Sequence, residues 1–317
     1  MISAISLNSV FTPEFIFTVI RVTTPILFGA MAAVICNKAG VINIALEGVM
    51  LTAALFGVFG SGYSQNLWVG ALVGILGGVL ISFLLAYFAL YLKTDIILAG
   101  IALNLSTVGG TIFLMFALTG DKGATNSVQS LQFPRIDIPF IKDIPFIGAA
   151  FSGHSLITYL AILTVFLVFF LLYKTPFGLR IRAVGENPDA ARSVGIDVSR
   201  VQLIALLISG VIASFGGMYM SMAYMNLFTN NMVAGRGYIA MAAAAMGQAN
   251  PVGTTIAAFL FGTMEAFGYQ LQSQGIPSQF INSIPYISVI IGLVLYSMYR
   301  QRLLKKKKEL KLKGKGV

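Results

Sequence analysis

Charged side chains are scarce in this chain of 317 residues. Asp, Glu, Lys and Arg together make up 10% of it, against about 25% in an ordinary soluble protein. Hydrophobic residues make up 57%, and a soluble fold of this size could not cover so much apolar surface with so few charges. Intrinsic disorder is excluded for the opposite reason, because it requires low hydrophobicity and high charge. The composition therefore predicts a polytopic, all-α membrane protein.

Cysteine and histidine are almost absent. With Cys36 and His154 as the sole members of their types, an internal disulfide framework is impossible and a Cys/His zinc site is unsupported. No pair of carboxylates has a spacing suited to acid–base catalysis, and no Walker A sequence occurs. We therefore expect a protein that is not an enzyme and that binds no metal, cofactor or nucleotide of its own.

Long stretches without charge indicate the membrane spans, because a spanning helix needs about 20 predominantly apolar residues. The expected spans are 15–36, 42–62, 67–92, 96–118, 155–173, 202–225, 237–247, 252–271 and 283–299. The seventh is too short to cross alone and ends in Gln-Ala-Asn-Pro. We expect it to be a broken or re-entrant helix, which is tolerated only where protein or a water-filled path satisfies its backbone. The prediction is a helical bundle of about nine spans, with eight to ten possible, occupying residues 1–299.

The basic residues predict the orientation of this bundle. If the segments 174–201 and 300–317 lie on one side, Lys38 and Lys93 fall on that side too, and it carries sixteen of the 21 Lys and Arg residues. Four basic residues then face the other side: Lys122, Arg135, Lys142 and Arg236. The positive-inside rule places the C-terminus in the cytoplasm, and nine spans place the N-terminus outside. Residues 1–20 contain no Lys or Arg and so lack the n-region of a cleaved signal peptide. We expect a multi-pass protein of the plasma membrane.

Two segments are expected outside the bilayer. The external loop 119–154 is either a linker or a docking surface for an external partner, because loops of this length are often functional. The tail 300–317 carries nine Lys/Arg and one Glu. It is interpreted as a segment held against anionic lipid headgroups rather than a nucleic-acid-binding tail, because no aromatic residues are interleaved for base stacking. His154 and Trp68 are interpreted as interfacial residues.

The most informative segment is the cytoplasmic loop 174–201, which contains PFGLRIRAVGENPDAARSVGIDVSR. Asn187 is a good N-cap, Pro188 suits the first helical position, and Gly195 can adopt the left-handed conformation after the last turn. A two-turn helix over 188–194 is therefore predicted. So short a helix is marginal in water, and it is either a docking element for a soluble partner or a loop that packs on itself.

Three motifs carry a resemblance to a known family. The run GLRIRAVGENPDAARSVGI resembles the cytoplasmic loop of ABC-importer permeases of the branched-chain amino acid, simple-sugar and nucleoside group. Residues 37–48, NKAGVINIALEG, resemble the entry motif of the nucleoside importers in that group, with Ala45 where the family usually has Gly. Residues 238–253, ending in GQANPVG, resemble the family's broken helix and Gly-rich turn. The resemblance covers about residues 15–300.

The resemblance implies a permease subunit that translocates nucleosides into the cell. It also implies three protein partners: an ABC ATPase that uses the ATP, a second homologous permease subunit and an external substrate-binding lipoprotein. The loop would hold the coupling helix that fits the ATPase, with coupling residues Gly178, Arg180, Arg182, Gly185, Glu186, Asn187, Pro188, Ala190, Ala191 and Gly195. The alternatives are an ABC permease for simple sugars or branched-chain amino acids and an ion-coupled secondary carrier.

A nucleoside offers a flat base and a polyol, so its path should combine aromatic faces with hydrogen-bonding groups. The candidate path residues are polar positions in or beside the spans: Asn43, Glu47, Asn104, Gln248 and Glu265. For Asn104 the competing interpretation is an interhelical hydrogen bond worth about 0.6–2 kcal/mol. Arg21, Glu47 and Glu265 are expected to be paired or exposed to a cavity rather than to form a proton or ion relay.

Overall fold

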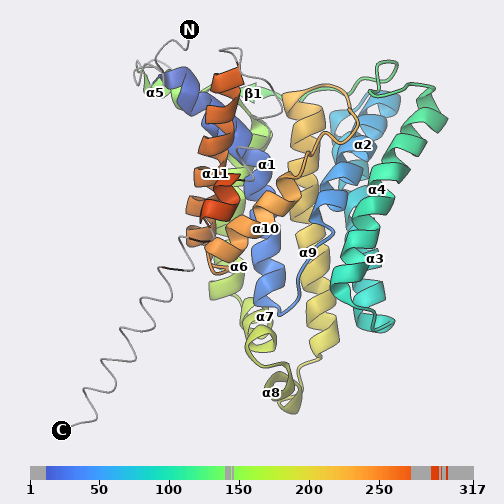
Figure 1. The fold of residues 1–317 in the computed structure, drawn as a ribbon, viewed down its shortest axis with the longest axis vertical. Helices are drawn as coiled ribbons and strands as arrows, with labels where there is room; N and C mark the ends of the chain where they lie inside the picture. The colour runs from blue at the N-terminus through green and yellow to red at the C-terminus, as the bar shows by residue number, and fades with distance from the viewer. Residues whose placement is uncertain are drawn as a thin grey trace.

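A computed structural model describes residues 12–139, 144, 146–272, 287–292, 294 and 298. These residues form a helical bundle (Figure 1), which confirms the all-α prediction. The helices are α1 (Pro13–Lys38), α2 (Leu46–Ser64), α3 (Leu67–Ala86), α4 (Ile96–Thr119), α5 (Ile147–Phe151), α6 (Leu156–Lys174), α7 (Pro176–Glu186), α8 (Pro188–Ser193), α9 (Val198–Tyr219), α10 (Arg236–Met246) and α11 (Pro251–Gln272). The π-helical segments η2 (Tyr87–Tyr91) and η3 (Met220–Tyr224) extend α3 and α9, and the strands β1 (Arg135–Ile136) and β2 (His154–Ser155) pair antiparallel.

Six helices of the described chain are long and apolar enough to cross a membrane: α1, α2, α3 with η2, α4, α6 and α9 with η3. They coincide with the first six expected spans. The seventh and eighth expected spans form α10 and α11. Most of the expected ninth span, 283–299, lies outside the described residues, as does the tail 300–317, so the count of nine stays a prediction.

Local capping residues set several of the helix boundaries. The Asn66 side chain accepts a hydrogen bond from the amide of Trp68 at 2.9 Å and begins α3. The Asp95 carboxylate accepts one from the amide of Ile97 at 2.7 Å and begins α4. Gly120, with φ of +71°, ends α4 in the left-handed conformation that glycine adopts without strain.

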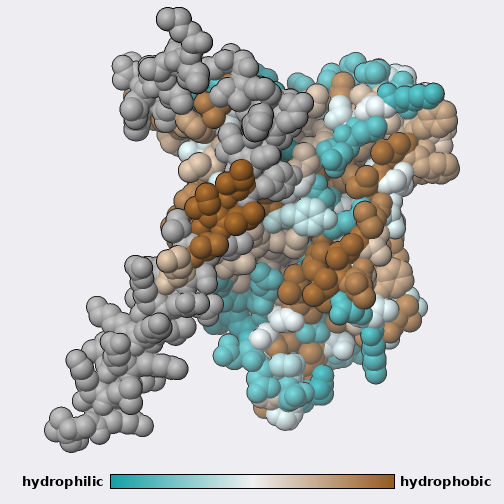
Figure 2. All heavy atoms as spheres, in the orientation of Figure 1, coloured by the Kyte–Doolittle hydropathy of each residue, from teal (hydrophilic) through white to brown (hydrophobic). Residues whose placement is uncertain are grey.

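Helix α1 lies at the centre of the bundle, where it packs against α6, α9, α10 and α11 (Figure 1). Every residue from Val22 to Cys36 is buried, as expected for a helix that is apolar on all sides. Helices α4 and α6 instead leave large apolar side chains exposed, including Leu105, Phe113 and Phe166. On the face in Figure 2, apolar residues lie over the middle of the bundle and hydrophilic residues gather around α8. The exposed side chains suit contact with lipid or with another apolar helix.

The break between α10 and α11 lies where the sequence predicted it. Helix α10 has only 11 residues and ends at Met246 with Gly247 as its C-cap, and α11 begins at Pro251. Gln248 and Ala249 form the turn with φ of +55° and +50°. The Asn250 side chain accepts a hydrogen bond from the amide of Val252 at 3.0 Å, which caps the start of α11.

The loop between α4 and α6 is held by the bundle over its described part. Backbone amides of Thr125, Ser130 and Phe133 donate to carbonyl oxygens of residues 222–228 at 2.8–2.9 Å. A free linker, one of the two interpretations from sequence, is therefore wrong for this part of the loop. The strands β1 and β2 form a short antiparallel pair at the same end of the bundle as α5, opposite α8 (Figure 1).

Two polar side chains are buried inside the fold, and for one of them, Arg236, the sequence prediction was wrong. The ring of His154 stacks on Phe17 with centroids 4.0 Å apart, and its Nε2 lies 3.0 Å from the carbonyl oxygen of Ala150. Burial lowers the pKa of His154, so the ring is neutral at pH 7. Arg236 is also buried, as the first residue of α10, instead of lying in an outer loop. In both cases a partner inside the fold satisfies a polar group that hydropathy alone places at the surface.

Candidate functional site

A helical hairpin formed by α7 and α8 stands at one end of the bundle (Figure 1). The Asn187 side chain accepts hydrogen bonds from the amides of Asp189 and Ala190 at 3.1 and 3.0 Å, and Gly195 has φ of +84°. Both features of α8 were predicted, although α8 ends at Ser193. Helix α7 was missed, and its signal was present in Thr175 followed by Pro176, since Thr175 Oγ accepts from the Gly178 amide at 3.0 Å.

Helix α7 docks on the bundle through two glycines. A Cβ at Gly178 would overlap the carbonyl oxygen of Leu171, and a Cβ at Gly185 would overlap that of Lys38. Gly40, with φ of +73°, faces Gly185 from the turn between α1 and α2, and a Cβ on it would lie 3.2 Å from the Gly185 Cα. The hairpin therefore rests directly on the α1–α2 turn, backbone against backbone.

The outer side of the hairpin is an exposed tip, which we define as Ala190 and Val194. Ala191 is buried, whereas Ala190 is exposed and Val194 is 74% exposed. The three residues do not form the single apolar face expected from sequence. Instead, Ala191 packs on the rest of the chain, and Ala190 and Val194 stay exposed in the part of the chain that the structure describes.

The charged side chains of the hairpin face away from the core. Arg180, Glu186 and Arg192 are exposed, and the exposed ion pair between Arg192 and Asp189, at 3.0 Å, contributes little to stability. The Arg182 guanidinium lies over the ring of Tyr173 at 5.1 Å from its centroid. This ring contact holds Arg182 against α6, whereas Arg180 stays available at the surface.

The α1–α2 turn is tied to neighbouring helices by side-chain amides. Gln202 of α9 donates to the Ala39 carbonyl oxygen at 3.3 Å, and Asn43 Nδ2 donates to Ser209 Oγ at 3.0 Å. Asn43 is 1% exposed, and its Oδ1 has no hydrogen-bond partner within the described chain. The turn is thus held between the hairpin and α9.

Asn104 of α4 caps α2 from a distance. The N-cap residue of α2, Ala45, has no side chain that can accept a hydrogen bond, and Asn104 Oδ1 accepts from the Gly48 amide at 2.8 Å instead. Asn104 Nδ2 donates to the Ile44 carbonyl oxygen at 2.8 Å and to the Tyr238 hydroxyl at 2.9 Å. These bonds join α4 to the starts of α2 and α10, as the interhelical hydrogen-bond interpretation of Asn104 predicts.

Glu47 joins the first turn of α2 to the first turn of α10. Its two carboxylate oxygens accept from the backbone amides of Gly235 at 2.7 Å and Gly237 at 2.8 Å. These amides belong to the helix start, where backbone donors have no partner within the helix and a negative charge is stabilised. Gly237 permits the approach, because a Cβ there would lie 2.6 Å from the Glu47 amide nitrogen. The carboxylate is therefore the N-terminal cap of the broken helix.

Arg236, between those two glycines, pairs with Glu265 of α11. The pair joins Arg236 Nη2 to Glu265 Oε1, and the side chains are 10% and 8% exposed. Nη2 also donates to the Tyr269 hydroxyl at 2.8 Å, while Nη1 donates to the Val233 carbonyl oxygen at 3.1 Å. Buried charges in a membrane protein persist when they are paired in this way. From the sequence, Glu265 could be predicted as a paired or cavity-facing carboxylate, but its partner Arg236 could not be identified.

The structure brings together only part of the predicted path. Glu47 and Asn104 meet around the start of α10, and Glu265 joins them through Arg236. Asn43 lies apart against α9, and Gln248 is exposed in the turn at the far end of α10. Within the described residues, no group of three or more His, Cys, Asp or Glu side chains could hold a metal ion.

Comparisons with known proteins give a consistent result. The family described as "Branched-chain amino acid transport system / permease component" matches residues 15–299. The nucleoside ABC transporter permease protein NupC of Lactococcus lactis is 34% identical over 86% of this chain and 89% of its own. The guanosine ABC transporter permease protein NupQ of Bacillus subtilis is 35% identical, with 85% and 87% covered. A putative glucose ABC transporter permease protein of Haloferax volcanii, TsgC13, is 32% identical, with 87% and 82% covered.

Replacing Glu47 should destabilise the bundle. In Glu47→Leu the amides of Gly235 and Gly237 at the start of α10 lose their acceptors, and the buried one costs roughly 1–3 kcal/mol, so the melting temperature in detergent should fall clearly. Glu47→Gln keeps one acceptor oxygen and should fall less. Glu14→Leu, at an exposed carboxylate of α1, is the matched control. Equal melting temperatures for Glu47→Leu and Glu14→Leu would contradict the capping role.

Adding one methyl group at Gly185 should lift the hairpin from the bundle. Gly185→Ala forces a Cβ into the Lys38 carbonyl oxygen, and overpacking of this kind costs about 1–3 kcal/mol. Trypsin should then cleave at Arg180, Arg182 and Arg192 faster than in the parent protein. Gly109→Ala is the control, because nothing lies within 4 Å of that Cβ. An unchanged cleavage rate in Gly185→Ala would show that the contact does not hold the hairpin.

Proposed function

The chain belongs to the branched-chain amino acid transport system permease family, and we propose that it carries nucleosides into the cell as the membrane-spanning subunit of an ABC importer. The observation that carries the substrate assignment is the likeness to a nucleoside permease and a guanosine permease over at least 85% of this chain. The Asn-Ile-Ala-Leu-Glu-Gly run, whose Glu47 caps α10, supports it.

A simple sugar is the second candidate substrate. The observation in its favour is the 32% identity to a putative glucose permease. A nucleoside contains both a sugar and a base, so uptake competition separates the two candidates. An ion-coupled carrier is less well supported, because the buried charges Arg236 and Glu265 pair with each other and do not form a chain of titratable groups across the bundle within the described residues.

In this proposal the α7–α8 hairpin is the contact with the ATPase, which places that end of the bundle in the cytoplasm. The exposed tip of Ala190 and Val194 offers a small apolar surface, and the basic residues of segment 174–201 fit the positive-inside rule. ATP would be bound and hydrolysed by that partner. A movement of the hairpin would reach the α1–α2 turn through Gly185 and the start of α10 through Glu47.

The remaining partners would cover other faces. The exposed apolar side chains of α3, α4 and α6 leave room for lipid and for a second permease subunit. The loop after α4, hydrogen-bonded to residues 222–230, presents a fixed surface at the opposite end from α8. This surface suits the docking of an external binding lipoprotein that delivers the nucleoside.

The substrate assignment is tested by uptake into proteoliposomes. The chain is expressed with candidate ATPase, second permease and binding-lipoprotein genes from its own genome, and the complex is reconstituted with ATP. Accumulation of labelled guanosine or uridine should require ATP, and unlabelled nucleosides should block it while glucose and leucine do not. Inhibition by glucose would favour the sugar alternative, and uptake driven by an ion gradient without ATP would contradict the ABC assignment.

The coupling role of α8 is tested at its exposed tip. Ala190→Trp adds a bulky ring without changing a spanning helix, and an overpacked contact should weaken ATPase association roughly 5- to 150-fold. The variant should accumulate normally in the membrane but lose uptake and release the ATPase during purification. Ala190→Gly, which costs mainly helix propensity of up to about 1 kcal/mol, should be milder. Parental uptake in Ala190→Trp with the ATPase still bound would rule out α8 as the coupling helix.

A further inference from the structure

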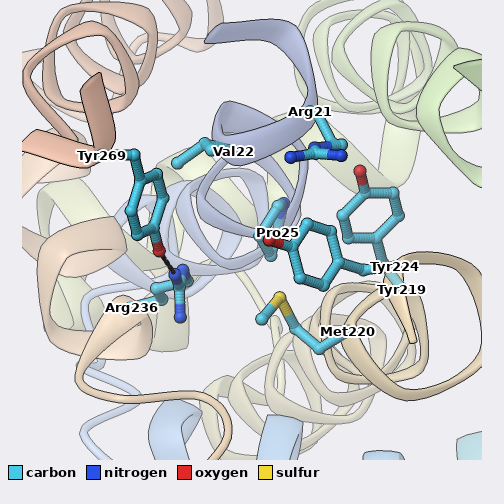
Figure 3. A pocket seen from close by; sticks show the side chains of 8 residues that line it. All are labelled: Arg21, Val22, Pro25, Tyr219, Met220, Tyr224, Arg236 and Tyr269. Atoms are coloured by element: carbon cyan, nitrogen blue, oxygen red, sulfur yellow. Dashed lines mark hydrogen bonds between the residues drawn. The ribbon is translucent and has the colours of Figure 1, made fainter. Parts of the chain in front are cut away.

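A narrow polar cavity lies between α1, α9, η3, α10 and α11, and with Arg21 in place it has room for about one water molecule. Figure 3 shows Tyr269 and Arg236 on one side of it and Arg21, Tyr219 and Tyr224 on the other. Val22, Pro25 and Met220 complete the lining. Three phenol rings and two guanidinium groups are an unusual lining for a space inside a membrane bundle, where polar groups are costly and are retained for function.

Two polar atoms at this cavity have unused hydrogen-bonding capacity. Arg236 is 8% exposed and lines the cavity, and its Nε has no hydrogen-bond partner within the described chain. The Nε atom of Arg21, which also lines the cavity, is likewise unpartnered within the described chain. Two buried donors left open in the lining favour a ligand that supplies hydrogen-bond acceptors, such as the carbonyl oxygens and ring nitrogens of a nucleobase.

The Tyr224 ring already holds a planar group. The guanidinium of Arg21 lies over it, with Cζ 4.8 Å from the ring centroid. A guanidinium and a nucleobase are both flat, and both stack on an aromatic face. Arg21 thus occupies the position that a stacked base would take, and its long side chain can swing aside to release the Tyr224 face.

Arg21 also connects the cavity with the end of the bundle opposite α8. One hollow beside it is lined by Tyr219 and Tyr224 and by three residues in or next to the paired strands β1 and β2: Arg135, Gly153 and His154. A second hollow extends from Arg21 and Tyr269 to Thr12 and Glu14 at the start of α1. Both hollows share Arg21 with the cavity and lie on its side toward the end where a binding lipoprotein would release its substrate.

We infer that this cavity is a nucleobase site on the transport path. The base stacks on Tyr224 in the space that the displaced Arg21 side chain and the adjoining hollow provide, and its acceptor groups bond to Arg236. The inference rests on the proposed nucleoside transport and deepens it. It also differs from the path predicted by sequence, because none of those five residues lines the cavity and Glu265 is linked to it only through its ion pair with Arg236.

The site is tested in the complete importer, reconstituted with its ATPase and binding lipoprotein. Tyr224→Leu removes the stacking face and should lower maximal guanosine uptake about tenfold, while receptor-stimulated ATP hydrolysis remains. Tyr224→Phe keeps the ring and should transport close to the parental rate. Tyr91→Leu, at a tyrosine of η2 that is 55% exposed, is the matched control.

A specificity ratio separates base recognition from a structural effect. Purines stack more strongly than pyrimidines, so Tyr224→Leu should lower guanosine uptake more than uridine uptake. Parental rates and ratios in Tyr224→Leu, or an equal loss of both nucleosides, would overturn the inference while nucleoside transport still stood. Absence of nucleoside uptake in the parental importer would instead overturn the proposed function itself.

Discussion

A helix that begins inside a membrane bundle exposes backbone amides that lipid cannot satisfy, and the carboxylate of Glu47 meets this constraint for α10. It binds the amides of Gly235 and Gly237 and so ties the start of the broken helix to the start of α2. The position of α10 then determines its neighbours, since Arg236 is aimed at Glu265 and Tyr238 at Asn104. The cap therefore also fixes the place from which Arg236 reaches Glu265.

The start of α2 is itself a shared element. The turn before it contacts the α7–α8 hairpin at Gly185, α9 through Asn43, and α4 through Asn104. A displacement of the hairpin therefore acts on the same few residues that hold the broken helix. Backbone contacts and buried hydrogen bonds transmit such displacements well, because close-packed interiors deform little. This is the physical basis for linking an ATPase at one end to a substrate site near the other.

Much of this architecture was predictable, because it depends on local features. Uncharged runs indicated the spans, the Gln-Ala-Asn-Pro segment indicated the break, and Asn187 with Gly195 indicated α8. The pairing of Arg236 with Glu265 and the capping by Glu47 were not predictable, because they join residues 29 and up to 190 positions apart. Composition places a charge in a span or a loop but does not show what it contacts, and Arg236 was misplaced for that reason.

Hydrogen exchange at the start of α10 tests the central role of Glu47 most directly. In the detergent-solubilised protein, peptides that contain Gly235 and Gly237 should be protected in the parent chain and should lose that protection in Glu47→Leu. Peptides from α1, which is buried at the centre of the bundle, should exchange equally in both proteins. Undiminished protection of residues 235–237 in Glu47→Leu would show that these amides have another acceptor and that the broken helix does not depend on Glu47.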